Sequence, residues 1–344
     1  MNLKKLYIFI SILIVILISF IGFNTYTKFY KANTIKEGYL FIPTNGTYED
    51  VEILVRPFLE RVNSFHFVAS TKRYSTVVKP GRYKIVKGMS NSELISNLKN
   101  GKQSIVKLSF NNQDSLEKLA GRIAEQIEAD SISLLELFYD ETFLNESGFT
   151  KNTALAMYIP NTYEFYWNTS AELFRSKMKT EYDRFWNSER IENAKKMGLT
   201  PIEITTLASI VQKETSTVKE RPLVAKLYLN RLRDGWPLQA DPTVIFALKQ
   251  EGDPNAIIKR VLKKDLTISS PYNTYINLGL PPGPIAMPDI SSIDAVLKPA
   301  NHNYFYMCAS ITKIGTHEFA TSLPEHNRNA AKYQLWLNQQ GINR

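Results

Sequence analysis

The sequence predicts an α+β fold attached to an N-terminal apolar helix, and three observations support this. Hydrophobic residues make up 44% of the 344 residues and aromatic residues 12%, which indicates a folded chain rather than a disordered one. A long apolar run lies near the N-terminus. Beyond it, segments with helical periodicity alternate with short strand-like segments. A chain of this length can hold two domains, each with its own core.

The apolar run follows Lys4 and Lys5 and contains, over residues 6–23, only apolar residues, two serines and one glycine. Phe20, Ile21 and Phe23 stand where a cleaved signal peptide would carry small residues. We therefore expect a short cytoplasmic tail (1–5), a single membrane-spanning anchor (6–24), and a large C-terminal part outside the cytoplasm.

Residues 36–110 are predicted to form a small α/β module without a catalytic constellation. Two strands, two helices and a third, capped helix are expected there, at Tyr39–Ile42, Arg82–Val86, Tyr48–Glu60, Ser64–Arg73 and from Ser90 to Asn100-Gly101. A module of this kind is typical of a binder or spacer. Residues 111–150 then form a helical connector, since apolar residues recur at helical spacing over Asp114–Asp140.

Residues 151–340 are predicted to form the catalytic domain, and its best-marked helix runs from Thr200 to Glu214. Thr200 is a good N-cap, Pro201 suits the first helical position, and Glu203 completes a capping box. The apolar residues that follow share one face of the helix with Glu214, at the spacings of Leu207, Ile210 and Val211.

Glu214 is the candidate catalytic residue. A carboxylate at the C-terminal end of a helix and in a partly apolar setting has a raised pKa, because both surroundings disfavour its charge. Such a group can act as a general acid near neutral pH. The local pattern alone favours a simpler interpretation, in which the helix ends and Glu214 points into water.

Neighbouring segments have simpler expected roles. The aromatic segment Tyr158–Trp167 is interpreted as core, although aromatics near a cleft can also stack on sugar rings. Helices are expected at Ala171–Trp186, at Pro222–Arg233 and at Thr243–Leu248, the last capped by Asp241. Cys308, the one cysteine, excludes an intrachain disulfide and is expected in the core.

Several short sequence motifs, taken in order along the chain, resemble those of the MltG (YceG-like) family of membrane-anchored endolytic murein transglycosylases. They are Leu207–Thr215, Glu220-Arg221-Pro222, Asn230-Arg231-Leu232, Leu238–Val244, Tyr272–Tyr275, Gly279–Ile285, the aromatic run at Tyr304, His317-Glu318-Phe319 and Glu325-His326-Asn327. The resemblance implies a LysM-like module at 36–110, a YceG-like α+β catalytic domain, and Glu214 as the catalytic glutamate. Gln212 stands where relatives often carry another glutamate, so no second glutamate competes with Glu214 for the role of the acid. Asn161 stands where relatives often carry an aspartate.

The activity that the resemblance implies is cleavage of the bond between N-acetylmuramic acid and N-acetylglucosamine within nascent glycan strands, leaving 1,6-anhydro ends. No metal or cofactor is implied. The partners are peptidoglycan strands, the membrane and, by implication, peptidoglycan synthases. Substrate-binding residues are expected in the matching phrases, at Gln239, Asp241, Thr243, Tyr272, Asn273, Thr274 and Asn230.

Alternatives remain open at this point. Glu214 and Asp241 can form the carboxylate pair of a hydrolase, or the chain can be a non-catalytic wall-binding scaffold. A metal site at His302, His317 and His326 lacks a familiar ligand spacing. The net charge of +9 suits a membrane surface, a wall polymer or nucleic acid, and the anchor with its large distal part argues against nucleic acid.

Overall fold

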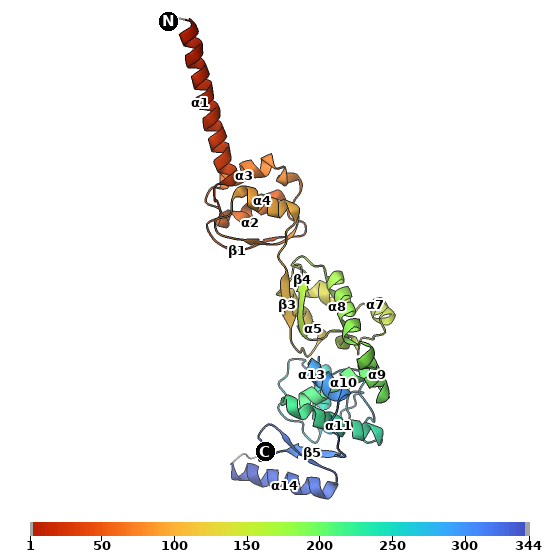
Figure 1. Cartoon of the computed structure of the whole chain (residues 1–344). Coiled ribbons are helices and arrows are strands. Elements are labelled where there is room, and N and C mark those ends of the chain that lie inside the picture. The colour runs from red at the N-terminus through yellow and green to blue at the C-terminus, as the bar shows by residue number, and fades with distance from the viewer. Residues whose placement is uncertain (1–2, 341–344) are drawn as a thin grey trace. The chain divides into compact units, whose positions relative to one another are not determined.

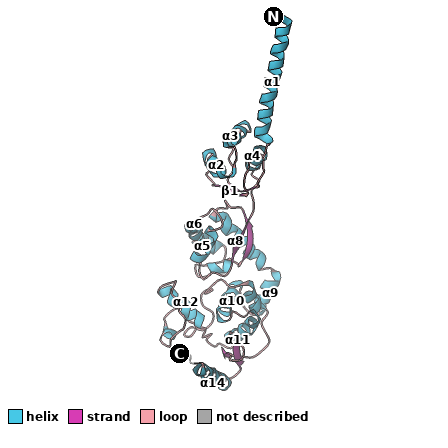
Figure 2. Ribbon diagram, turned by 90° about the vertical axis from the view of Figure 1, so that its left-hand side faces the viewer, coloured by secondary structure: helices cyan, strands magenta, loops and turns pink. Residues whose placement is uncertain are grey.

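The computed structural model describes residues 3–340 and divides the chain into two compact units. The first comprises residues up to 108 together with 125–129 and 163–170, and the second comprises 109–124, 130–162 and the residues from 171 onward. Helices dominate and the strands are short (Figure 2). The predicted α+β class with an N-terminal apolar helix is confirmed.

The N-terminal helix α1 (Leu3–Tyr30) is longer than the predicted anchor of 6–24. Its 28 residues span about 42 Å, whereas a bilayer core is about 30 Å thick. Its length and composition suit a membrane span, and near the N-terminus they suit a signal sequence equally. At its C-terminal end Phe29 packs on the core of the first unit, and the Lys28 ammonium lies 4.3 Å from the ring centre of Phe67.

The first unit contains an antiparallel pair of strands covered by helices (Figure 1). In β1 (Gly38–Ile42) and β2 (Gly81–Ile85), Gly38 pairs with Ile85 and Ile42 with Gly81. The helices are α2 (Tyr48–Val55), α3 (Val62–Thr71) and α4 (Asn91–Asn100). The expected helix Tyr48–Glu60 is shorter because Pro57 begins a 3-10 turn at Arg56–Phe58. The likeness of this unit to a LysM module stays a prediction.

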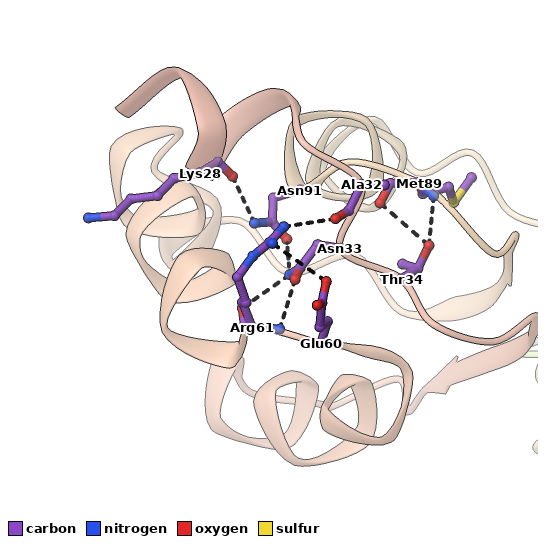
Figure 3. Close-up of polar contacts among 8 residues, drawn as sticks. All are labelled: Lys28, Ala32, Asn33, Thr34, Glu60, Arg61, Met89 and Asn91. Carbon is purple, nitrogen blue, oxygen red and sulfur yellow. Dashed lines mark hydrogen bonds and ion pairs between the residues drawn. The ribbon is translucent and has the colours of Figure 1, made fainter. Parts of the chain in front are cut away.

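A buried polar network joins the end of α1 to the first unit (Figure 3). Asn91 donates to the Lys28 carbonyl at 2.9 Å and accepts from the Asn33 amide at 2.7 Å. Asn33 also exchanges hydrogen bonds with the Arg61 backbone, at 3.1 and 2.8 Å. Both asparagines are fully buried, so this network holds the residues after the anchor against the module.

The second unit is mainly helical. Its helices are α5 (Leu116–Ala124), α6 (Ser131–Phe138), α7 (Glu141–Glu146), α8 (Ala171–Phe185), α9 (Ser188–Lys196), α10 (Pro201–Glu214), α11 (Arg221–Arg233), α12 (Asp241–Glu251), α13 (Ile290–Leu297) and α14 (Leu323–Gln339). The predicted connector of residues 111–150 thus contains three separate helices, α5, α6 and α7, and the predictions for α8 and α11 are confirmed within a residue.

Two strand pairs were not predicted from the sequence. β3 (Val106–Phe110) pairs with β4 (Asn161–Phe165), and β5 (Tyr306–Ala309) forms an antiparallel hairpin with β6 (His317–Ala320). Cys308 lies in β5 and is partly exposed, so the expectation that it lies in the core is wrong.

Helix α10 lies among α9, α11, α12 and α13. Ser209 accepts a hydrogen bond from the backbone of Ile285 at 3.0 Å, and Oε1 of Gln212 accepts from the Asp289 amide and the Ser292 hydroxyl at 2.6 and 3.0 Å. Gln212 therefore holds the start of α13. Gly283 permits a close approach of backbones, since a Cβ there would lie 2.0 Å from the Asn152 carbonyl oxygen.

Candidate active site

Glu214 is the last residue of α10, at the end of its apolar stripe. The Thr200–Glu203 capping box forms as predicted, with the Thr200 amide donating to Glu203 at 2.7 Å. Leu207, Ile210 and Val211 are completely buried, whereas Glu214 keeps part of its side chain exposed. The stripe thus ends in a glutamate that is less buried than the apolar residues before it.

Tyr228 is the direct partner of Glu214. It lies on α11, which packs against α10, and its hydroxyl donates a hydrogen bond of 2.7 Å to Oε1 of Glu214. Tyr228 is almost completely buried, and this burial raises its pKa well above the usual value. The phenol therefore remains a hydrogen-bond donor over the whole working pH range.

The pKa of Glu214 is raised above its ordinary value, in the direction predicted from the sequence. Burial is the main cause, and the negative charge of Asp241 adds to it. The hydrogen bond from Tyr228 acts in the opposite direction, as do the positive charges of His317 and Arg231. The site therefore favours a neutral carboxylic acid while stabilising the carboxylate once the proton has left.

The segment after Glu214 is held by the β5–β6 hairpin. The Thr217 hydroxyl donates to the Gly315 carbonyl at 3.2 Å. Glu220 is buried and accepts from the backbone amide of His317 at 2.6 Å, and its other oxygen lies 3.0 Å from Nδ1 of His317. This pairing was not predicted from the sequence, although both residues lie in motifs that resemble those of the family.

Gln239 and Asp241 lie in an exposed turn that leads into α12. Gln239 is exposed between the buried Leu238 and Ala240 and has φ of +50°, a left-handed conformation that non-glycine residues rarely adopt. Asp241 is exposed, and its Oδ1 accepts from the Tyr275 hydroxyl at 2.6 Å. The prediction that Asp241 caps Thr243–Leu248 is wrong, because the helix begins at Asp241 itself and the carboxylate bonds Tyr275 instead.

Two buried threonines fix this turn to the segment 270–277. The hydroxyls of Thr243 and Thr274 lie 2.8 Å apart, and the Thr274 hydroxyl also accepts from the Ala240 amide at 3.0 Å. The backbone amide of Gln239 donates to the backbone carbonyl of Thr274 at 3.0 Å. Neither threonine is exposed, so both orient the turn rather than offer their own side chains to a ligand.

The remaining predicted binding residues are also buried. The side-chain amide of Asn230 donates to the backbone carbonyls of His302 and Tyr304, both at 3.1 Å. The side-chain amide of Asn273 donates to the backbone carbonyls of Leu266 and Ile268, both at 2.9 Å. Tyr272 is 3% exposed. The structure therefore places Asp241 close enough for its charge to act on Glu214, keeps Gln239 and Asp241 exposed, and leaves Asn230, Asn273 and Tyr272 within the supporting framework.

Arg231 connects several of these parts. Its Nε donates to the Phe305 carbonyl at 2.8 Å and its Nη1 to the Leu238 carbonyl at 2.5 Å. Within residues 3–340 no cluster of His, Cys, Asp or Glu side chains has the arrangement of a metal site. His302 instead contacts the backbone of Leu223 and Tyr304, each at 3.0 Å.

A family model described as the YceG-like family matches residues 24–332. The chain belongs to the YceG-like family. This YceG-like chain is 33% identical over 269 residues to the endolytic murein transglycosylase of Bacillus subtilis (strain 168), which covers 74% of the chain and 72% of that relative. It is 28% identical over 297 residues to the protein of the same name from Streptococcus pneumoniae serotype 2, over 78% of the chain and 53% of that longer relative.

The fold of the chain is also found in a solved structure. The crystal structure of a YceG-like protein from Listeria monocytogenes is 26% identical in sequence and has a TM-score of 0.58, covering 85% of this chain and 98% of that one. These likenesses confirm the family resemblance that the motif phrases indicated.

Proposed function

We propose that this YceG-like chain is a membrane-anchored endolytic murein lytic transglycosylase with Glu214 as its catalytic acid and base. The observation that carries the proposal is a half-buried carboxyl group with a raised pKa, bonded through one oxygen to Tyr228. The relatives named endolytic murein transglycosylases support the same activity.

In the proposed reaction, neutral Glu214 gives its proton to the oxygen that links N-acetylmuramic acid to N-acetylglucosamine, and the bond from C1 to that oxygen breaks. The carboxylate then takes the proton of the muramic acid 6-hydroxyl, whose oxygen bonds to C1 and closes the 1,6-anhydro ring. One carboxyl group therefore serves both steps, whereas hydrolysis usually requires two.

The other residues divide into two groups in this proposal. Gln239 and Asp241 contact the glycan, because both side chains are exposed in the turn that carries Asp241, whose charge acts on Glu214. Thr243, Thr274, Tyr272, Asn273 and Asn230 are positioning residues, because they are buried and hold the backbone of the site. Preorganisation of this kind aligns the substrate and the developing charge in the transition state.

The proposed location follows from α1, which fits a single-pass anchor of the cell membrane with the second unit on the outer side. There the enzyme would meet nascent glycan strands and the synthases that polymerise them, and by cutting the strands it would limit their elongation. The proposed reaction needs no cofactor.

Digestion of purified glycan strands tests the proposal. Wild type should release products with 1,6-anhydro ends, which are one water lighter in mass than products with reducing ends, and Glu214→Gln should release none while keeping its fold. Reducing ends would support the hydrolase with Glu214 and Asp241 as a pair. Wild-type rates from Glu214→Gln would exclude Glu214 as the catalyst, and an inactive wild type would favour a wall-binding scaffold.

A further inference from the structure

A cavity lies in the same unit as Glu214, which is not among its lining residues. Its volume is about 810 Å³. It extends between the start of α5 and helix α12, and its lining includes Pro242 and Tyr272. Pro242 follows Asp241, whose charge acts on Glu214, so the cavity and the candidate active site share the start of α12.

The walls of this cavity are apolar and its charges are mainly positive. Leu155, Phe246 and Ile285 are among the apolar residues. Four lysines and two carboxylates also line it, which leaves an excess of two positive charges. The two carboxylates already have partners, since Asp114 lies 2.6 Å from Lys213 and Glu117 accepts from Tyr139 at 2.8 Å.

Lys249 is the lysine most available to a ligand, because it has no ion-pair partner in the described part of the chain. Lys151 is paired with Glu141 at 3.9 Å, and its ammonium lies 5.9 Å from the ring centre of Tyr139. Neutral sugars would leave the Lys249 ammonium without a counter-charge. A peptide with an excess of carboxylates and several alanine side chains would satisfy this lysine through a carboxylate and the walls through its methyl groups.

We propose that this cavity binds the peptide stem of the glycan strand whose sugar occupies the site at Glu214. The inference rests on the proposed function, because stems occur only on murein. The stem branches from the muramic acid residue that Glu214 would attack. Five extended residues reach about 17 Å, and the cavity shares the start of α12 with Asp241, whose charge acts on Glu214, so a stem can enter the cavity while its sugar is bound.

The test compares glycan strands that carry pentapeptide stems with strands from which an amidase has removed them. Lys249→Glu and Lys151→Glu should each raise KM for stem-bearing strands about fivefold, with kcat unchanged, since a reversed charge repels the stem carboxylates. Neither change should affect stem-free strands. Lys195→Glu is the matched control, because Lys195 is exposed on α9 outside the cavity.

Equal KM changes on both kinds of strand, or no change on stem-bearing strands, would overturn the proposal. A titration of the N-acetylated pentapeptide N-acetyl-L-Ala-γ-D-Glu-L-Lys-D-Ala-D-Ala into Glu214→Gln is independent of turnover, and the acetyl group removes the amine charge that the stem also lacks in the strand. Saturable binding that Lys249→Glu weakens is expected, and absence of binding contradicts the cavity's role. If wild type cuts neither strand, the proposed function fails, and this titration alone then decides about the cavity.

Discussion

The Tyr228 hydroxyl donates to Oε1 of Glu214 and thereby distinguishes the two oxygens of one carboxyl group. In the neutral acid the oxygen that accepts this bond is the carbonyl oxygen, so the acidic proton resides on Oε2. A tyrosine on one helix therefore determines which oxygen of a glutamate on another helix delivers the proton.

Tyr228→Phe should lower kcat about 10- to 100-fold with little change in KM, because the acid loses its fixed orientation. The Tyr228 hydrogen bond lowers the pKa of Glu214, so its loss raises that pKa. Activity that requires the protonated acid then persists to higher pH, and the basic limb of the kcat profile moves upward. Steady-state assays from pH 5 to 9 measure both effects.

The control for that variant is Tyr158→Phe. Tyr158 is as deeply buried as Tyr228, but its hydroxyl has no hydrogen-bond partner among residues 3–340. Its removal should leave kcat and the pH profile unchanged. An unshifted basic limb in Tyr228→Phe would contradict the orienting role of this hydrogen bond.

Glu214→Gln should stabilise the fold at pH 8 and not at pH 4. In the unfolded chain Glu214 titrates near its ordinary value of 4.5, and below that pH both states hold the proton. At higher pH the folded state retains a proton that the unfolded state has lost, so stability falls as pH rises. Glutamine cannot titrate and removes this loss.

Thermal melting at the two pH values measures that effect, since about 1 kcal/mol moves Tm by about 2–4 °C in a domain of about 150–250 residues. Glu203→Gln is the control for removing a charge from the other end of α10. An equal change of Tm at both pH values in Glu214→Gln would refute the predicted linkage.

Thr274→Val should destabilise the turn that carries Gln239 and Asp241. The Ala240 amide is buried and would lose its acceptor, which costs about 1–3 kcal/mol. The kcat/KM should fall with it, while Thr274→Ser, which keeps the hydroxyl, should retain both properties. Chemical denaturation and strand digestion give the two readouts, and unchanged stability in the valine variant would be inconsistent with the role of this bond.

Asn91→Ala should loosen the junction between α1 and the first unit. It removes a donor to the Lys28 carbonyl and an acceptor for Asn33, at a cost of about 2–3 kcal/mol. Faster hydrogen exchange is expected over residues 28–34, with the second unit unaffected. Asn100→Ala, at the exposed end of the same helix, is the control. Unaltered exchange at the junction would disprove this role of the network.

Local signals allowed the sequence to predict α10 and the pKa direction of Glu214, because a capping box and an apolar stripe act within a few residues. The Tyr228 bond, the Glu220–His317 pair and the strand pairs depend on contacts between distant segments. The wrong role for Asp241 has the same cause, since Tyr275, 34 positions away, takes the carboxylate.

The contacts of the β5–β6 hairpin also bear on how the protein is made. Thr217 bonds to the carbonyl of Gly315, 98 positions later in the chain, and Glu220 contacts His317, 97 positions later. A nascent chain that has crossed the membrane only as far as residue 300 carries Glu214 without the hairpin that holds the segment after it. On the proposed function, we expect no cutting of murein before the hairpin residues 306–320 have been translated and exported, so the order of assembly protects the wall from a partly made enzyme.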